Sequence, residues 1–198
     1  MRLASMRCTH SCDADVFLQS YRPGALAARG FAPQALAELR PGIVCVSVSA
    51  YGHAGPWAKR RGFDSLVQSA SGIAWQEQQA AHANQPRHLP CQALDHATGY
   101  LAAFGAMIAL ARRAREGGSW HVRLSLAQTG SWLQSFGAVP DGLQAPDLAA
   151  ADVRDRIDRI ASPFGTIDAV RPAERLSATP PSFTRPPVPL GTDDASWL

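Results

Sequence analysis

The chain has 198 residues, of which 46% are hydrophobic and 18% are charged, and a formal net charge of +3. This length is enough for one substantial hydrophobic core, and the composition is too apolar for a disordered chain. The arginines form no long basic tract, so nucleic acid is not expected as a partner, and no run approaches the roughly 18 apolar residues that a membrane-spanning helix needs.

Residues 1–12 are predicted to be irregular. They hold no apolar core of the kind that a secretory signal requires, so the four cysteines of the chain are expected to be reduced thiols in the cytoplasm. Cys8, His10 and Cys12 lie close together, but no second pair of cysteines or histidines follows at zinc-finger spacing. No metal site is therefore expected.

Predicted strands and short helices alternate along residues 15–51, and a loop follows at 52–62. Residues 15–19 and 43–49 are predicted strands, and the second has too few polar positions for an exposed face, so it is expected inside a sheet. Short helices are expected at 24–28 and 34–39. Residues 52–62 form a predicted loop that carries Lys59, Arg60 and Arg61.

A helix is predicted at 64–71, followed by a surface loop at 76–87, where no apolar period is present. Asp95 opens the longest helical pattern, which runs from residue 96 or 97 to about Arg115. Its last turns are basic and it ends at a glycine pair, as the helix dipole favours.

The strictly alternating residues 121–126 predict a further strand, and a helix is expected around 128–136. Alternating strands and helices are typical of α/β architecture. Beyond residue 140 the pattern weakens: one charged helix is expected at 152–160, a last strand at 164–170, and a proline-rich extended tail after it.

Three segments stand out on this map because they lie at strand ends or helix starts. They are Ser-Tyr-Arg-Pro-Gly at 20–24, Gly-Phe-Asp-Ser-Leu at 62–66, and Ala-Leu-Asp-His-Ala-Thr-Gly at 93–99. The carboxyl edge of a parallel sheet, with helix N-termini beside it, is where α/β proteins bind anionic ligands.

In this order the segments resemble the class III CoA-transferase family, also known from formyl-CoA and carnitine CoA-transferases. The family pattern is Asn-Phe-Arg-Pro-Gly, a strand leading to Gly-Phe-Gly and Gly-Pro, then Gly-Tyr-Asp, a helix-opening Asp, and a Gly-Arg-Gly-Gln turn. The matching residues here are 20–24, 50–52, 55–56, 62–64, Asp95 and 116–119. The resemblance covers about residues 15–135.

The resemblance implies an α/β fold with an open, parallel, Rossmann-like sheet. The catalytic portion is expected at 13–139, and 140–198 would hold a linker, short α/β elements and the tail. It implies acyl-CoA and carboxylic acid substrates, with coenzyme A as the carried group and no metal. Asp95 would be the nucleophile, forming an aspartyl anhydride and then an aspartyl-CoA thioester. The alternative for Asp95, from the helix pattern alone, is a helix N-cap.

The resemblance also implies that Asp64 positions the nucleophile, whereas its ordinary alternative is a first-turn helix residue. Ser20, Tyr21, Arg22 and Arg61 would bind CoA by the same resemblance. Tyr21 and Arg22 could instead only stabilise a turn, and Arg61 could be a solvated surface residue. His96, about 100° around the helix from Asp95, is expected to pack or face solvent.

Two departures from the family pattern are expected to matter. Ser20 replaces the usual Asn, and the chain is expected to lack the N-terminal segment that precedes the first matched strand in family members, as well as a glycine-rich loop. Family members form interlocked homodimers, so a homodimer or a complementing chain is the expected partner. The alternatives are an inactive fragment or assembly subunit, and an acyl-CoA racemase. The racemase is less favoured because Phe63 stands where racemases have a proton-exchanging His.

Overall fold

The structure, a computed structural model, describes residues 13–193. The predictions for residues 1–12, including those for Cys8 and Cys12, lie outside this range. The chain divides into two compact units, Met1–Leu143 and Gln144–Leu198. The predicted functional residues all lie in the first unit, which is described first.

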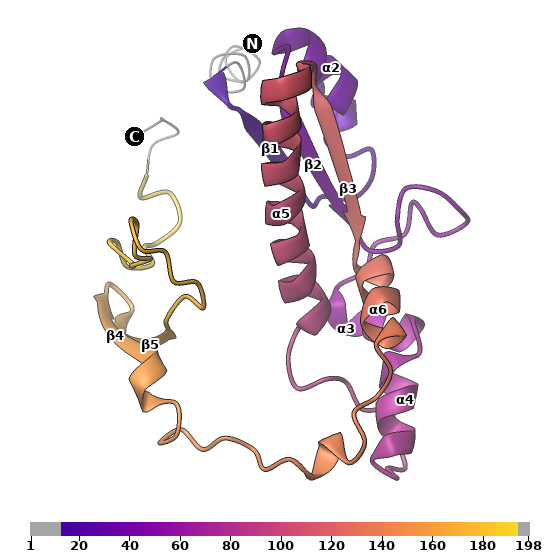
Figure 1. Ribbon diagram of the computed structural model, residues 1–198, viewed down its shortest axis with the longest axis vertical. Coiled ribbons are helices and arrows are strands. Elements are labelled where there is room, and N and C mark those ends of the chain that lie inside the picture. Colours follow the sequence, from indigo (N-terminus) through magenta and orange to yellow (C-terminus); the bar gives the residue numbers. More distant parts are fainter. Residues whose placement is uncertain (1–12, 194–198) are drawn as a thin grey trace. The chain divides into compact units, whose positions relative to one another are not determined.

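A parallel sheet of three strands forms the centre of the first unit, in the order β1-β2-β3 (Figure 1). The strands are β1, Val16–Gln19, β2, Val44–Ser49, and β3, Trp120–Ser125. Gln19 pairs with Ser47, and Ser49 pairs with Ser125, so all three strands end at the same edge. The predicted α/β class with an open parallel sheet is therefore confirmed, with strand bounds shifted by about one residue.

Helix α5, Ala93–Glu116, covers one face of this sheet. Ala102 and Ala109 are buried in one cluster with Val44 and Val46 of β2, and Val122 of β3 packs against this cluster. Gly105 lies so close to β3 that an added Cβ would be 2.7 Å from a methyl group of Val122. Small residues thus bring α5 close to β2 and β3.

The opposite face is covered by α2, Pro33–Leu39, whose Leu36 is buried with Ile43 and Cys45. The predicted helix at 24–28 is wrong. A turn precedes a 3-10 helix, η1, Ala27–Arg29, which ends at Gly30 in the left-handed conformation. Proline favours a helix start, but here Pro23 and Gly24 form the turn.

Three shorter helices form a second apolar cluster at the carboxyl edge of the sheet. They are α3, Asp64–Ala70, α4, Ile73–Ala80, and α6, Leu126–Ser135. Val67, Ile73, Leu94 and Leu126 are buried together there. Ser125 caps α6 by accepting a hydrogen bond from the backbone N–H of Gln128 at 3.2 Å.

The predicted loop at 76–87 is partly wrong, because α4 continues through Gln76 to Ala80. Only the first turn of α4 contributes buried apolar residues, Ile73 and Ala74. The remaining Gln, Glu and Ala residues are good helix formers that need no apolar period, so the pattern did not reveal them. Gln134 of α6 donates to the Gln76 side chain at 2.9 Å and fixes the exposed side of α4.

Helix α5 starts at Ala93, three or four residues earlier than predicted. Gln92 occupies the N-cap position, so Asp95 lies inside the first turn and is not the N-cap.

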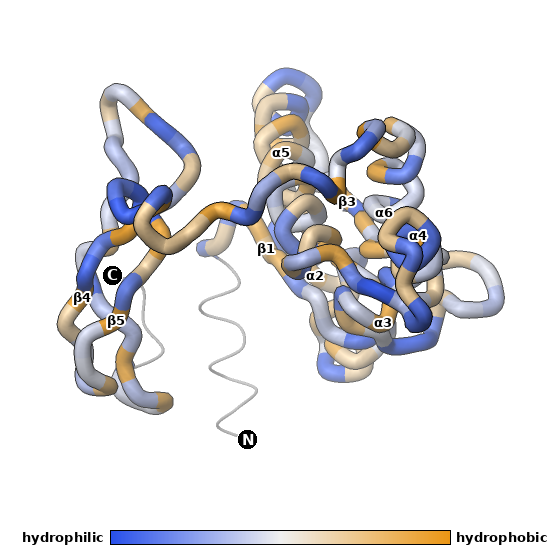
Figure 2. The backbone as a smooth tube through the Cα atoms, turned by 90° about the horizontal axis from the view of Figure 1, so that it is seen from below, coloured by the Kyte–Doolittle hydropathy of each residue, from blue (hydrophilic) through white to orange (hydrophobic). Residues whose placement is uncertain are grey.

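Within the described part of the chain α5 is also the one helix that is long and apolar enough, by length and composition, to cross a membrane. That result differs from the expectation of no such segment, because Ala, Gly and Leu make α5 apolar along much of its length (Figure 2). Its packing on β2 and β3 is that of a helix covering a sheet.

The second unit contains an antiparallel hairpin of β4, Ile157–Ser162, and β5, Gly165–Val170. The predicted strand at 164–170 is confirmed, but the predicted helix at 152–160 is wrong. The 3-10 helix η3, Arg154–Arg156, leads into β4 there, and another, η2, Gly142–Gln144, lies at the unit boundary. Arg159 pairs with Asp168 at 2.9 Å, and Asp158 pairs with Arg171 at 2.6 Å, so charged residues of this segment form ion pairs across the hairpin.

Candidate functional site

The Arg-Pro-Gly segment forms a tight turn directly after β1. The backbone N–H of Ala25 donates to the carbonyl of Arg22 at 2.9 Å, and Gly24 has φ 85°. Proline followed by a glycine of positive φ is the pairing that a type II turn requires. The turn thus holds Tyr21 and Arg22 just beyond the carboxyl end of β1.

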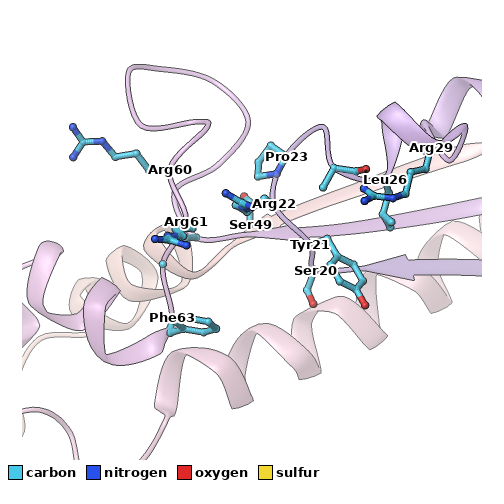
Figure 3. A pocket seen from close by; sticks show the side chains of 13 residues that line it. Ser20, Tyr21, Arg22, Pro23, Leu26, Arg29, Ser49, Arg60, Arg61 and Phe63 are labelled. Atoms are coloured by element: carbon cyan, nitrogen blue, oxygen red, sulfur yellow. Dashed lines mark hydrogen bonds between the residues drawn. The ribbon is translucent and has the colours of Figure 1, made fainter. Parts of the chain in front are cut away.

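A cavity of about 820 Å³ lies at this turn and is lined by four arginines, which we call the cationic cavity (Figure 3). The arginines are Arg22, Arg29, Arg60 and Arg61. The described lining residues include no carboxylate. Tyr21 and Ser20 complete the side formed by the end of β1, and Ser49 contributes the end of β2. A cavity lined by several guanidinium groups suits a ligand with phosphate groups.

Arg60 and Arg61, which belong to the loop before α3, differ in the direction of their side chains (Figure 3). Arg60 lies over the ring of Trp57, 4.8 Å from its centroid, and Trp57 in turn packs edge-on against Tyr51. Figure 3 shows Arg60 pointing away from Arg22 and Arg61. Arg61 therefore faces the cavity more directly than its neighbour does.

Asp64 is the first residue of α3 and is almost fully buried, at 2% exposure. One carboxylate oxygen accepts a hydrogen bond from the side-chain amide of Gln68, and the other accepts one from the backbone N–H of Asp95 at 2.9 Å. Gln68 also accepts from the N–H of Leu89 at 2.8 Å. Asp64 is thus more than an ordinary first-turn residue: it satisfies a free N–H at the start of α5 and fixes that turn.

Asp95 itself is exposed, and its side chain faces a second cavity. Partial desolvation by the surrounding protein raises the pKa of its carboxyl above the ordinary value, and the nearby Asp64 carboxylate raises this pKa further. His96 opposes both effects and lowers the pKa of Asp95. A partly desolvated carboxylate that faces a cavity can act as a nucleophile.

The second cavity, which we call the apolar groove, has a volume of about 540 Å³ and lies between β1, β2 and α5. Its walls include Val16 and Leu18 of β1, Val46 and Val48 of β2, and Ala102 and Ala106 of α5. Asp95 and Thr98 lie on its wall from the first turns of α5.

The two cavities are adjoining. Ser20, Ser49, Ala50, Gly62 and Phe63 line both of them. A ligand with a polyanionic part and a reactive apolar part could therefore occupy the cationic cavity and reach Asp95 through the shared residues.

The structure brings together most of the residues that the sequence predicts. Ser20, Tyr21, Arg22 and Arg61 line the cationic cavity, Asp95 lines the groove, and Asp64 contacts the backbone of Asp95. Sequence reasoning missed Arg29 and Arg60 as lining residues. Arg60 belonged to the basic cluster at 59–61, but for Arg29 only its closeness to the Arg-Pro-Gly turn could have indicated a role.

Among residues 13–193 no group of three or more His, Cys, Asp or Glu side chains could hold a metal ion. Cys45 is buried on β2 and Cys91 is exposed. The arrangement of groups at the candidate site is that of an anion-binding cavity beside an apolar groove with one carboxylate.

Comparison with known proteins gives the family of this architecture. The family model described as "CoA-transferase family III" matches residues 12–169, which is most of the chain. The chain belongs to CoA-transferase family III. The matched region contains both cavities and all of the β4–β5 hairpin except Val170.

Several proteins of CoA-transferase character are similar to the chain. A probable CoA-transferase of Mycobacterium tuberculosis is 35% identical over 122 residues, which are 59% of this chain and 15% of that protein. The beta subunit of a succinyl-CoA–L-malate CoA-transferase from Chloroflexus aurantiacus is 26% identical over 121 residues, covering 59% of this chain and 28% of that subunit. The chain thus spans less than a third of the length of these two relatives.

A solved structure supports the family III fold. The crystal structure of the protein Rv3272 from M. tuberculosis superposes with a TM-score of 0.61 at 27% sequence identity. The match covers 68% of this chain and 37% of that one. The parallel sheet and its covering helices are therefore those of a class III CoA-transferase.

Proposed function

We propose that this chain transfers CoA between an acyl-CoA thioester and a carboxylic acid. The observation that carries the proposal is the adjoining pair of cavities, one lined by four arginines and the other by Asp95. The phosphates of CoA would bind in the cationic cavity, and the thioester would lie in the groove at Asp95. Membership of CoA-transferase family III supports this assignment.

In the proposed reaction the Asp95 carboxylate attacks the thioester carbonyl carbon. The C–S bond breaks and CoA leaves as a thiolate, which leaves a mixed anhydride between Asp95 and the acyl group. The thiolate then attacks the Asp95 carbonyl carbon, which releases the first carboxylic acid and forms an aspartyl-CoA thioester. The acceptor carboxylate attacks this thioester to give a second anhydride, and return of the thiolate to the acceptor acyl carbon regenerates Asp95.

The other residues bind or position in this scheme. Arg22 and Arg61 pair with phosphates, Ser20 and Tyr21 contact the nucleotide portion, and Arg29 and Arg60 add to the positive field. Asp64 acts through the backbone of Asp95, because it accepts the Asp95 N–H and does not line the groove among the residues described. We assign Asp64 a positioning role and Asp95 the catalytic one.

The intact mass of the chain after incubation with acyl-CoA thioesters tests this proposal. We expect an added mass on the wild type, trapped by hydroxylamine as an Asp95 hydroxamate, and no added mass on Asp95→Asn. Glu38→Gln, which removes an exposed carboxylate on α2, is the matched control and should react as the wild type does. An adduct that survives in Asp95→Asn would contradict the assignment.

Racemisation is less well supported than transfer. Phe63 is 80% exposed and lines both cavities, at the position where the racemase alternative requires a proton-exchanging side chain. A phenyl ring exchanges no proton. Incorporation of deuterium from heavy water at the α-carbon of a bound acyl-CoA would overturn this preference.

A second candidate function is that of a subunit completed by another chain, either a second copy or a separate polypeptide. The observation that favours it is the position of β1, which is the edge strand of the sheet in the described part of the chain. Exposed edge strands invite pairing with a further strand. A folded chain that forms no Asp95 adduct alone, and gains this reaction in a stoichiometric complex, would establish the subunit role.

A further inference from the structure

The apolar groove has room for more than the thioester carbonyl. Asp95 is at the N-terminal end of α5, and the groove continues past Gly99, Ala102, Ala103 and Ala106, which are one, two and three turns further along the helix. None of these positions carries a side chain longer than a methyl group. The apolar groove, about 540 Å³ in volume, is therefore lined by small residues along the first three turns of the helix after Asp95.

The opposite wall of the groove is equally apolar. Val16 and Leu18 of β1 and Val46 and Val48 of β2 face α5, because alternate residues of a strand point to the same side of the sheet. Leu18 is largely exposed on this wall of the groove. A ligand that covered it would remove apolar surface from water, which is favourable.

The charges of the groove exclude one large class of substrates. Among the described residues that line it, Asp95 is the one with an ionisable side chain, and no arginine, lysine or histidine reaches it. A second carboxylate on the acyl group, as in a dicarboxylic acid, would meet the negative charge of Asp95 without any cation to pair with.

We propose that the apolar groove binds an unbranched aliphatic acyl chain, so that the enzyme prefers medium-chain acyl-CoA thioesters to acetyl-CoA and to dicarboxylic acyl-CoA thioesters. This inference rests on the proposed function, since it takes the thioester carbonyl to lie at Asp95. The small residues of α5 make the space, and the valines and leucine of the sheet supply the contacts.

Binding of unreactive thioethers separates this inference from the proposed function. S-methyl-CoA, S-octyl-CoA and S-(7-carboxyheptyl)-CoA carry the same nucleotide and differ only in the part that would enter the groove. By titration calorimetry we expect S-octyl-CoA to bind at least about tenfold more tightly than either of the others, because several methylene groups leave water. Ala103→Trp, at an exposed lining position, should reduce this preference to about twofold or less and leave S-methyl-CoA binding unchanged.

Met107→Trp is the matched control, because Met107 is an exposed residue of α5 that does not line the groove as described. It should keep the wild-type preference, and circular dichroism of both variants verifies the helix. Equal affinities for the three thioethers would overturn the acyl-chain inference while leaving the CoA site intact. Failure of all three to bind a folded chain would overturn the CoA site as well. If Ala103→Trp instead breaks a dimer and the wild type shows no octyl preference, the groove is a protein interface and the inference is wrong.

Discussion

The backbone N–H of Asp95 donates to the buried carboxylate of Asp64 at 2.9 Å, so one acid of the site holds the main chain of the other. Asp64 lies on α3 and Asp95 on α5, 31 residues apart in sequence. The second oxygen of Asp64 is occupied by Gln68. The geometry of Asp95 therefore depends on a carboxylate that accepts from two donors at once.

Asp64→Asn should disturb this arrangement, because an amide has one acceptor oxygen and would turn its NH2 group toward a donor. We expect a loss of about 1–3 kcal/mol of unfolding free energy, measured by urea denaturation, and slower adduct formation at Asp95. Glu38→Gln, an exposed acid-to-amide change, should alter neither quantity. Wild-type stability in Asp64→Asn would mean that the two hydrogen bonds do not constrain α5.

The raised pKa of Asp95 predicts a specific pH dependence. The pKa of Asp95 in the native state lies above 3.8, the ordinary value that applies to the unfolded chain. At a pH between the unfolded and the native pKa, the native state therefore binds more protons than the unfolded state. The unfolding free energy should therefore decrease as the pH rises from the unfolded pKa to the native pKa of Asp95. This loss of stability persists at neutral pH. Asp95→Asn removes the titrating group, so the variant should gain stability relative to the wild type as the pH rises. Thermal melts of both proteins at pH 3 to 7 measure this difference. Adduct formation, which needs the ionised carboxylate, should have the opposite pH dependence and fall as the pH is lowered through the native pKa.

The arginines of the cationic cavity should act on the phosphates of CoA. Arg61→Ala is expected to weaken CoA binding by about five- to tenfold, the size of one charge-assisted hydrogen bond at an accessible site, and to leave pantetheine binding unchanged. Arg87→Ala makes the same charge change at an exposed position outside the cavity and should have no effect. Equal effects of Arg61→Ala on CoA and pantetheine would contradict a phosphate contact.

The buried hydroxyl pair of Thr98 and Thr129 supports the wall of the groove. Their oxygens are 2.7 Å apart, and Thr129 also donates to the carbonyl of Ser125 at 3.2 Å. Thr129→Val leaves the Thr98 hydroxyl unpaired and should cost about 1–3 kcal/mol of unfolding free energy. The double variant, with valine at both positions, should be less destabilised than the sum of the two single variants. Additive losses in this double-mutant cycle would show that the hydroxyls do not interact.

Two glycines of α5 should respond oppositely to alanine. Gly105→Ala places a methyl group against Val122 and should cost about 1–3 kcal/mol of unfolding free energy, part of which Val122→Ala should restore. Gly99 has no atom within 4 Å of the added methyl position, so Gly99→Ala should stabilise the chain by about 0.5–1 kcal/mol. Equal effects of the two substitutions would contradict the close approach of α5 to β3.

The parts of the fold that could be predicted are those whose apolar pattern reflects burial. The run at 43–49 became the central strand, and the alternation at 121–126 became its neighbour, because each side chain there faces a covered or an open side of one sheet. The second turn of α4 could not be predicted, since its helix depends on Gln and Glu propensity. The helix predicted at 152–160 is wrong for a different reason. Arg159 pairs with Asp168 on the neighbouring strand of a hairpin, and a partner across strands produces no periodic pattern in the local sequence.

The site shows the same division. Asp95 and Arg22 are predictable because they belong to segments that resemble the family pattern, and Arg61 because it directly precedes one of these segments. The structure places all three around adjoining cavities. The start of α5 was misplaced because Gln92 is an unusual N-cap, and only Asp64, which is distant in sequence, reveals why the helix begins there. Arg29 lines the cavity together with the Pro-Gly turn, and its closeness to that turn in the sequence is too weak a signal to predict this role.

The contact of Gly105 with Val122 also sets how the length of α5 can change. The close contact of Gly105 with Val122 fixes the rotation of α5 against β3, and Asp95 lies ten residues before Gly105 on the same helix. Inserting or deleting one residue between them would rotate Asp95 by about 100° around the helix axis, away from the groove. Substitutions on the outer face of α5 do not change the angle between Asp95 and Gly105 around the helix axis, whereas insertions or deletions between these two residues do. Related chains should therefore differ in the composition of this helix and keep a fixed spacing between the aspartate and the glycine.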